Sequence, residues 1–245
     1  MNNRAVIEVK DLNKSFGDNH VLRDFSMTLN QGENLAILGK SGSGKSVLIK
    51  CIIRLLALDR GSIMVLSNEI TEMSQEELDQ LRARVGFLFQ SNALYDSMTV
   101  RENLEFPLRR HWRPDQREKD AEEAILEALT DVGLEHTINM MPAELSGGMR
   151  KRIALARTLI LRPEIILYDE PTTGLDPVTA REISQLIVSV QGKYNTSSVI
   201  ISHDMNCIHI TSNRVIMLID GACYANDTYE KLRSSNDIRI KEFFD

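Results

Sequence analysis

The first 38 residues alternate between hydrophobic and polar positions, a pattern that is typical of β-strands. The alternation predicts strands over Ala5–Val9, Val21–Leu29 and Asn34–Leu38. Two turn-forming pairs, Gly17-Asp18 and Gln31-Gly32, separate these strands. The chain is therefore expected to begin with short strands joined by turns.

A glycine-rich loop follows the third strand, and an apolar segment over Val47–Leu56 comes after it. This is the strand–loop–helix order of a nucleotide-binding unit. Further along, Ser74 and Glu77 have the spacing of a capping box, which predicts the start of a helix. The apolar positions of that helix are Leu78, Leu81 and Val85, and a short strand is predicted over Val85–Phe89.

From residue 91 to about residue 161 the apolar positions take a helical spacing. One helix is predicted over Asp115–Val132, with Gly133 as its C-terminal stop. Its apolar face consists of Ala121, Ile125, Ala128, Leu129 and Val132. A second helix is predicted from about Gly148 to Leu161, ending before Pro163. We interpret this stretch as a helical insert within an α/β core.

The last third of the chain returns to buried strands. Ile165–Tyr168 is continuously apolar, which is typical of a sheet covered on both faces. Asp176 and Pro177 are suited to the N-cap and first position of a helix. The apolar positions of this helix are Ala180, Ile183, Ile187 and Val190. Further strands are predicted over Ser198–Ile201, and over Arg214–Ile219 paired through Asp220-Gly221 with Ala222–Ala225.

The composition is that of a globular chain: 245 residues, 42% hydrophobic and 26% charged. The 29 Lys+Arg against 35 Asp+Glu give a net charge of −6, which disfavours a broad nucleic-acid-binding surface. There is no apolar run of about 18 residues and no apolar signal core, so we expect neither a membrane span nor export. Cys51, Cys207 and Cys223 are expected to be buried free thiols in a cytosolic protein.

The glycine-rich loop fits the phosphate-binding spacing G-x-x-x-x-G-K-[ST]. Its members are Gly39, Lys40, Ser41, Gly42, Ser43, Gly44, Lys45 and Ser46. The glycines let backbone N–H groups converge on phosphate oxygens, Lys45 reaches the β- and γ-phosphates, and Ser46 can bind Mg²⁺. A flexible Gly/Ser turn is the alternative, and the position between a strand and a helix argues against it.

Two acidic residues, Asp169 and Glu170, follow the strand Ile165–Tyr168. Successive strand side chains point to opposite sides, so this pair can divide two roles. Asp169 would orient Mg²⁺, and Glu170 would be the general base that activates water. Taken alone, an Asp that only caps the next turn is equally plausible, but the phosphate loop favours the catalytic interpretation.

A third motif, Leu145-Ser146-Gly147-Gly148-Met149, precedes a basic helix. Two glycines at a helix N-terminus form an anion-binding nest, and Ser146 adds a hydroxyl donor. An isolated motif of this kind would be interpreted as a plain start of a helix. In a chain that already has a phosphate loop, it predicts a second phosphate site.

Six motifs in this order resemble the ATP-binding cassette (ABC) ATPases of ABC transporters: the phosphate loop, Gln90 after a strand, LSGGM, the Asp-Glu strand, GLDP, and Ser202-His203-Asp204. The resemblance covers about residues 5–232. It implies an α/β fold, a P-loop NTPase core with an antiparallel β-subdomain and an inserted α-helical subdomain. Residues 1–245 would form a single domain, with the core in 1–90 and 162–245 and the helical subdomain in 91–161.

The resemblance also assigns roles to single residues. The implied catalytic residues are Glu170, His203, Lys45 and Gln90. Phe16 matches the aromatic residue that stacks on adenine, which is usually Tyr, and His203 matches the residue that contacts the γ-phosphate. Asp176 matches an Asp that crosses a dimer interface, a role that is compatible with its N-cap position.

The implied cofactors are ATP and Mg²⁺, with the metal held by Ser46, Gln90 and Asp169. The implied assembly is a head-to-tail homodimer. In it, ATP is clamped between the phosphate loop of one subunit and Ser146, Gly147 and Gly148 of the other.

Two details narrow the resemblance to the ATPases of Mla/Mce-type lipid transporters, which move phospholipids or other hydrophobic molecules across the envelope of double-membraned bacteria. Met149 replaces the usual Gln of the signature, and the segment Ser91–Val100 follows Gln90. The implied partners are an MlaE-like permease and an Mce-domain protein, at the cytoplasmic face of the inner membrane, with no nucleic acid. An importer ATPase for polar solutes, a non-transport ABC ATPase and a regulatory nucleotide-binding module are the alternatives.

Four apolar residues, Leu94, Tyr95, Met98 and Phe106, lie among polar ones just after Gln90. Such a segment can form a groove for a helix of the permease, or it can belong to the core of the helical subdomain. Both interpretations remain open for the single residues, and we favour the groove for the segment as a whole.

Overall fold

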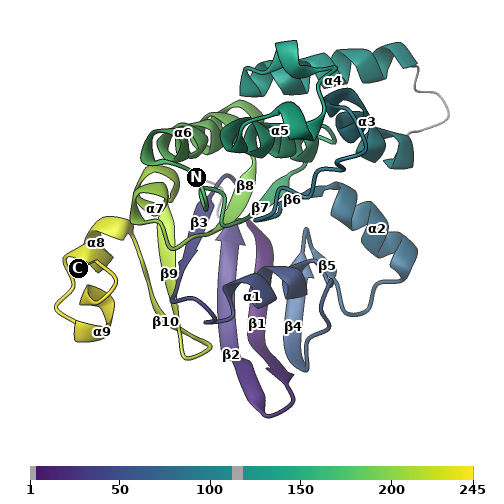
Figure 1. Cartoon of the computed structure of the whole chain (residues 1–245). Coiled ribbons are helices and arrows are strands. Elements are labelled where there is room, and N and C mark those ends of the chain that lie inside the picture. The colour runs from purple at the N-terminus through teal and green to yellow at the C-terminus, as the bar shows by residue number, and fades with distance from the viewer. Residues whose placement is uncertain (1–3, 112–117, 245) are drawn as a thin grey trace.

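A six-stranded sheet crosses the centre of the molecule (Figure 1). The structure is a computed structural model, and it describes residues 4–111 and 118–244. The strand order is β10 (Ala222–Asp227), β9 (Arg214–Ile219), β3 (Asn34–Leu38), β8 (Ser197–Ile201), β7 (Ile165–Asp169) and β6 (Val85–Leu88). β10 pairs antiparallel with β9, and every other neighbouring pair is parallel. The carboxyl ends of the parallel strands therefore meet at one edge of the sheet.

The predicted antiparallel β-subdomain is a four-stranded sheet below the first (Figure 1). Its order is β2 (Asn19–Asn30), β1 (Ala5–Phe16), β4 (Arg60–Val65) and β5 (Asn68–Glu69). The predictions Ala5–Val9 and Val21–Leu29 were too short, because both strands run for 12 residues. Register shifts along the β1–β2 pair accommodate the polar residues of both strands. Asp11 and Asp24 in these strands have positive φ.

Two of the predicted helices near the phosphate loop end earlier than expected. The segment predicted as Val47–Leu56 is α1 (Lys45–Ile52), because the backbone turns at Arg54, where φ is 52°. The capping box of Ser74 and Glu77 is present and opens α2 (Gln75–Ala83). The prediction that Val85 belongs to this helix was wrong, since Val85 is the first residue of β6.

The helical subdomain consists of α3 (Val100–His111), α4 (Glu118–Val132) and α5 (Gly147–Leu159), with short 3-10 turns at Glu135–Thr137 and Pro142–Glu144. The predicted face of α4 is buried against α3 and α5. The predicted start of this helix at Asp115 lies outside the described residues. Sequence analysis did not predict α3, which begins at a capping box formed by Thr99 and Glu102.

Four further helices of the described residues, α6 to α9, lie toward the other end of the large sheet (Figure 1). As predicted, α6 (Pro177–Tyr194) begins after an Asp176 N-cap, and it is followed along the chain by α7 (Met205–Thr211). The C-terminal α8 (Tyr229–Arg233) and α9 (Ile238–Lys241) bury Leu232 and Ile240 in a cluster with Leu38. None of the described helices is long and apolar enough to cross a membrane.

The three cysteines are free thiols. Cys51 and Cys207 are buried and Cys223 is half-buried. Burial raises the pKa of both buried thiols to about 11, so they are protonated at neutral pH. This matches the expectation of buried, unreactive thiols at these two positions.

Candidate functional site

The phosphate loop connects the end of β3 to the start of α1, and its glycines are packed closely. Gly44 has φ of +101°, and a Cβ atom there would lie 2.8 Å from Val21 Cγ1. A Cβ atom on Gly39 would lie 2.6 Å from Ser43 Oγ and 2.8 Å from Leu218 O. The first N–H groups of α1 have no acceptor within the helix. This backbone is therefore free to bind an anion.

Lys45 lies at the N-terminus of α1 with its ammonium group turned back onto the loop. Its Nζ donates hydrogen bonds to Gly39 O at 2.8 Å and to Lys40 O at 3.1 Å. Burial lowers the pKa of Lys45, and the negative charges of Glu170 and Asp169 act in the opposite direction. The Lys45 ammonium group is thus held against two carbonyls of the loop, and two carboxylates attract it.

Asp169 is the last residue of β7, and it accepts a hydrogen bond from Ser46 Oγ at 2.9 Å. Burial raises the pKa of Asp169, while the Ser46 hydrogen bond opposes that shift. Hydroxyl and carboxylate oxygens are the ligands that Mg²⁺ prefers, so this pair fits the predicted metal. Bound there with ATP, Mg²⁺ would supply positive charge to the phosphate groups.

Glu170 follows Asp169 directly but has different partners. Its backbone has φ of +52°, and its N–H donates to Ile201 O at 2.9 Å. Its Oε2 accepts a hydrogen bond from Thr173 Oγ1 at 3.1 Å and lies 2.8 Å from His203 Nδ1. A left-handed backbone is strained for a residue other than glycine, and such strain is common where a side chain must be aimed at a site. Glu170 is thereby held toward His203.

A cleft of about 590 Å³ brings most of the predicted residues together. Its lining includes Phe16, Ser41, Gly42, Gly44, Lys45, Ser46, Gln90, Glu170 and His203. Phe16 is 48% exposed at the rim of the cleft, so its ring is accessible to a base. Gln90 enters the cleft from the end of β6 and is also exposed. The residues present therefore fit a nucleotide with its magnesium ion.

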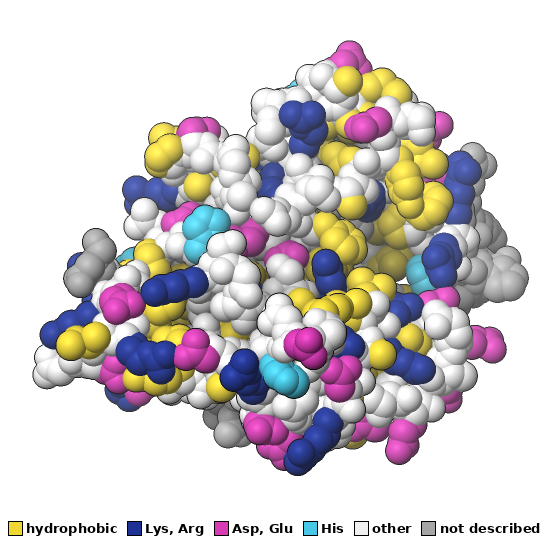
Figure 2. Space-filling view, turned by 60° about the horizontal axis from the view of Figure 1, so that its bottom comes forward, with side chains coloured by type: hydrophobic (Ala, Val, Ile, Leu, Met, Phe, Trp, Pro, Cys, Tyr) yellow, Lys and Arg dark blue, Asp and Glu magenta, His cyan; other side chains and the backbone are white. Residues whose placement is uncertain are grey.

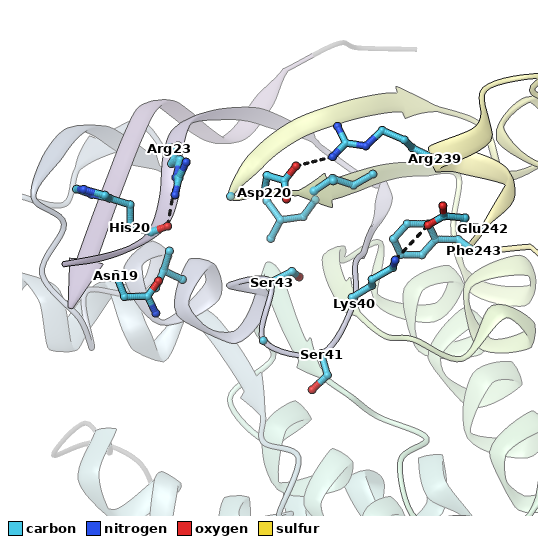
Figure 3. A pocket seen from close by; sticks show the side chains of 15 residues that line it. Asn19, His20, Arg23, Lys40, Ser41, Ser43, Asp220, Arg239, Glu242 and Phe243 are labelled. Carbon is cyan, nitrogen blue, oxygen red and sulfur yellow. Dashed lines mark hydrogen bonds and ion pairs between the residues drawn. The ribbon is translucent and has the colours of Figure 1, made fainter. Parts of the chain in front are cut away.

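Two predicted phosphate-loop residues face the other side of the loop. The side chains of Lys40 and Ser43 line a separate hollow of about 740 Å³ (Figure 3). In it, Lys40 Nζ lies 3.1 Å from Glu242 Oε2, and Arg239 pairs with Asp220 at 2.5 Å. Lys40 is thus directed toward α9 and away from the nucleotide cleft.

Ser146, Gly147, Gly148 and Asp176 are not among the described residues that line this cleft. Ser146 caps α5 by accepting a hydrogen bond from Met149 N–H at 3.2 Å. A Cβ atom on Gly148 would lie 2.6 Å from Thr179 Cγ2, so glycine allows α5 to pack against α6. Asp176 accepts hydrogen bonds from the hydroxyl and N–H of Thr179, which lower the pKa of Asp176.

Sequence analysis missed Lys151, a buried lysine of α5. It is 2% exposed and donates a hydrogen bond to Gln90 O at 3.0 Å. Burial lowers the pKa of Lys151 to about 8, opposed by the charges of Asp169 and Glu170. Its position three and four residues before the buried Ala154 and Leu155 was the available signal that this lysine faces the interior.

Comparisons with known proteins agree with this geometry. The sequence profile of the ABC transporter family matches residues 22–173. The chain is 39% identical over 239 residues to the probable ribonucleotide transport ATP-binding protein mkl of Mycobacterium leprae, covering 98% of this chain and 68% of that protein. Mycobacterium tuberculosis has a similar relative, of which the chain spans 66%.

The chain is also 36% identical over 241 residues to the intermembrane phospholipid transport system ATP-binding protein MlaF of Haemophilus influenzae, covering 98% of this chain and 90% of that protein. Among solved structures, it is similar to a dimeric ATP-binding cassette in a post-hydrolysis state bound to ADP and Pi. The TM-score is 0.83 at 30% identity, over 91% of this chain and 98% of that chain.

We predict that Lys45→Ala abolishes ATP hydrolysis and weakens nucleotide binding. Losing one pre-aimed cation at a phosphate costs roughly 10²–10³-fold in rate. Lys40→Ala is the matched control in the same loop, and its exposed pair should change hydrolysis by less than about fivefold. Phosphate release and binding of a fluorescent ATP analogue measure both effects. Wild-type turnover in Lys45→Ala would overturn the assignment of this loop.

We predict that Glu170→Gln binds ATP but hydrolyses it very slowly, and accumulates as an ATP-bound dimer. The amide keeps the shape of the side chain but cannot accept a proton from water. Size-exclusion chromatography with light scattering, with and without Mg-ATP, measures the dimer. Glu164→Gln, an exposed carboxylate just before β7, is the control that should behave as wild type. Equal hydrolysis in Glu170→Gln and wild type would place the base elsewhere.

Proposed function

This chain belongs to the ABC transporter family, and we propose that it is the ATP-hydrolysing subunit of a transporter that moves phospholipids between the membranes of a double-membraned bacterium. One cleft combines a phosphate-loop lysine, the Ser46–Asp169 pair and a Glu170 held beside His203. This combination carries the ATPase part of the proposal, because phosphoryl transfer depends on positioning and on charge at the phosphates.

Glu170 is the group in this cleft that is suited to accept a proton from water. Glu170 is buried, with 8% of the residue exposed. Its carboxylate contacts the Thr173 hydroxyl on one side and the His203 ring on the other. A base that is fixed in place does not need to be oriented during the reaction. Lys45 adds a positive charge beside the phosphate loop, and the Glu170 carboxylate attracts it.

The chain is proposed to work as a homodimer with two composite sites. Ser146–Gly148 and Asp176 lie outside the cleft of their own chain, which supports the implied arrangement in which they complete the site of a second copy. Val178, in the first turn of α6, is 69% exposed beside Asp176, so an apolar side chain is available there for a partner to cover. The similar solved cassette is itself a dimer.

The substrate part of the proposal rests on two observations. The chain covers nearly the whole length of the MlaF relative, whose name specifies phospholipid transport. The segment Ser91–Val100 and Met149 of the signature support the same subfamily. The alternative function is that of an ATPase of an importer for small polar solutes. The mycobacterial relative that is named for ribonucleotide transport supports this alternative.

A membrane permease is proposed to dock on an exposed aromatic pair. The rings of Tyr95 and Phe106 lie 4.9 Å apart, and their residues are 43% and 41% exposed. Leu94 and Met98 are partly buried, and Leu94 packs against two core clusters. The groove interpretation thus suits the two aromatic residues, and the core interpretation suits Leu94. Figure 2 shows hydrophobic side chains gathered at its upper right, on the side where α3 lies in Figure 1.

The remaining proposed partners follow from the lipid assignment. An MlaE-like permease would hold the ATPase dimer at the cytoplasmic face of the inner membrane, as a peripheral subunit. An Mce-domain protein would belong to the same complex.

We predict that the complex of this chain with its permease, in phospholipid vesicles, moves a fluorescent phospholipid when Mg-ATP is added. The same complex with Glu170→Gln is the control, and it should bind ATP without moving lipid. Transfer to acceptor vesicles is measured together with phosphate release. Hydrolysis that a ribonucleotide or another polar solute stimulates, without lipid movement, would overturn the lipid assignment.

We predict that Tyr95→Asp with Phe106→Asp prevents assembly with the permease but leaves the isolated chain folded. Both residues are exposed in the free chain, whereas an unpaired carboxylate buried against an apolar helix costs about 1–3 kcal/mol or more. Leu126→Asp, an exposed apolar residue of α4, is the matched control that should still assemble. Co-purification and thermal unfolding are measured side by side. A large loss of melting temperature would return the aromatic pair to the subdomain core.

A further inference from the structure

Lys14 lies beside Phe16, the aromatic residue at the rim of the nucleotide cleft. Both residues belong to β1, and positions 14 and 16 face the same side of the strand because successive side chains alternate. Lys14 Nζ lies over the Phe16 ring, 5.3 Å from the ring centroid. Phe16 lines the cleft, whereas Lys14 is not among the described residues that line it. The ammonium group therefore interacts with the ring without forming part of the cleft itself.

The Lys14 ammonium group is fixed in place by Asp59, the residue before β4. Lys14 Nζ donates a hydrogen bond to Asp59 Oδ1 at 2.8 Å, and Ser15 N–H donates to Asp59 Oδ2 at 2.6 Å. Asp59 N–H in turn donates to Asn13 O at 2.9 Å. The hydrogen bonds from Lys14 and Ser15 lower the pKa of Asp59, so this carboxylate is charged at neutral pH. The acceptor of Lys14 is thus itself bonded to two backbone groups of β1.

The tip of the β1–β2 hairpin offers the Phe16 ring little packing. Phe16 is the last residue of β1 and is exposed. Gly17 follows with φ of +59°, and a Cβ atom there would have no neighbour within 4 Å. The Lys14 side chain is better enclosed, with 14% of its surface exposed. Because a desolvated cation is attracted to a ring more strongly than an exposed one, Lys14 is a substantial contact of Phe16.

A cation on one face of an aromatic ring affects how the other face stacks on a nucleotide base. Both faces of such a ring carry negative charge, which opposes direct face-to-face stacking with another ring. A cation over one face draws this electron density toward itself, so the repulsion on the other face decreases. The Phe16 ring has no polar atom, so stacking is the interaction that it can offer a base. A cation that strengthens stacking is therefore useful at this position.

We propose that Lys14 is the positioning residue of Phe16: it holds the ring at the rim of the cleft and strengthens the stacking of the ring on the base of the bound nucleotide. The proposal rests on the proposed function for the role of Phe16 toward the base. Lys14 contributes to the affinity for the base alone, because its ammonium group is paired with Asp59 and lies outside the cleft lining. Different cations thus serve the two ends of the nucleotide, Lys14 at the base and Lys45 at the phosphates.

The test compares Lys14→Met and Lys14→Arg in the full-length chain. Isothermal titration is carried out with Mg-ATP and with magnesium tripolyphosphate, which has the phosphate chain without the base. Lys14→Met should weaken ATP binding by about 3- to 10-fold, the size of one cation–π contact, and leave tripolyphosphate binding within about twofold of wild type. Lys14→Arg should recover most of the ATP affinity, since a guanidinium group also stacks on an aromatic face.

Hydrolysis kinetics in the same variants give an independent readout. In Lys14→Met, KM for ATP should rise in parallel with the dissociation constant, and kcat should stay within about twofold of wild type. This separation is expected because the base is bound equally in the ground state and in the transition state.

Lys10→Met is the matched control, since Lys10 is an exposed lysine of the same strand that pairs with Glu8. This variant should bind both ligands as the wild type does. A double-mutant cycle with Phe16→Leu tests whether Lys14 acts through the ring. Once the ring is absent, Lys14→Met should cause no further loss of ATP affinity.

Three results would contradict the proposal. The first is wild-type ATP affinity in Lys14→Met. The second is an equal loss of affinity for ATP and for tripolyphosphate, which would make Lys14 a general contributor to charge or to folding. The third is a loss of ATP affinity that persists in the Phe16→Leu background. A wild-type chain that bound ATP but hydrolysed none would refute the proposed function, whereas the titrations would still decide the role of Lys14.

Discussion

The parallel alignment of β3, β6, β7 and β8 is the constraint on which the site depends. Each strand ends at the same edge of the sheet, and each is followed there by one part of the chemistry: the phosphate loop after Leu38, Gln90 after β6, Asp169 and Glu170 at β7, and His203 after β8. The registers are uninterrupted along these pairs. A slip of one residue would move Asp169 away from Ser46, because it would turn every side chain of the strand to the other face.

Four buried charged side chains meet at this edge of the sheet, and burying them costs free energy. Lys45, Lys151, Asp169 and Glu170 are all buried, although isolated buried charges are unfavourable. Each cation is attracted by both carboxylates, so removing one member would leave the others uncompensated. Such a cluster adds little to the stability of a domain, whereas it fixes the relative positions of the phosphate loop, β7 and α5. The arrangement is therefore better explained by the reaction than by folding.

The sequence allowed prediction of the motifs and the strand–helix order, but not of contacts that depend on tertiary packing. The boundaries of β3 and the N-cap of α6 follow from local patterns, and both were predicted correctly. α3 was missed because its charged residues and Pro107 interrupt the apolar spacing, while its start depends on Thr99 and Glu102. Lys151 was taken only as part of a basic helix, because no local pattern shows that an acceptor 61 residues away will face its ammonium group.

The residues of the nucleotide cleft do not indicate which cargo is transported, and the reason is physical. The side chains that line the cleft are those that phosphates, a base and a metal ion require, and every transporter of the family must meet the same requirement. Relatives named for phospholipid and for ribonucleotide transport can therefore share 36% and 39% identity with this chain. Residues of the ATPase that differ with the cargo are expected only where the permease touches it. In this molecule the exposed pair of Tyr95 and Phe106 is the surface proposed for that contact. On the proposed function, the permease would select the cargo, and the nucleotide cleft would serve any cargo equally.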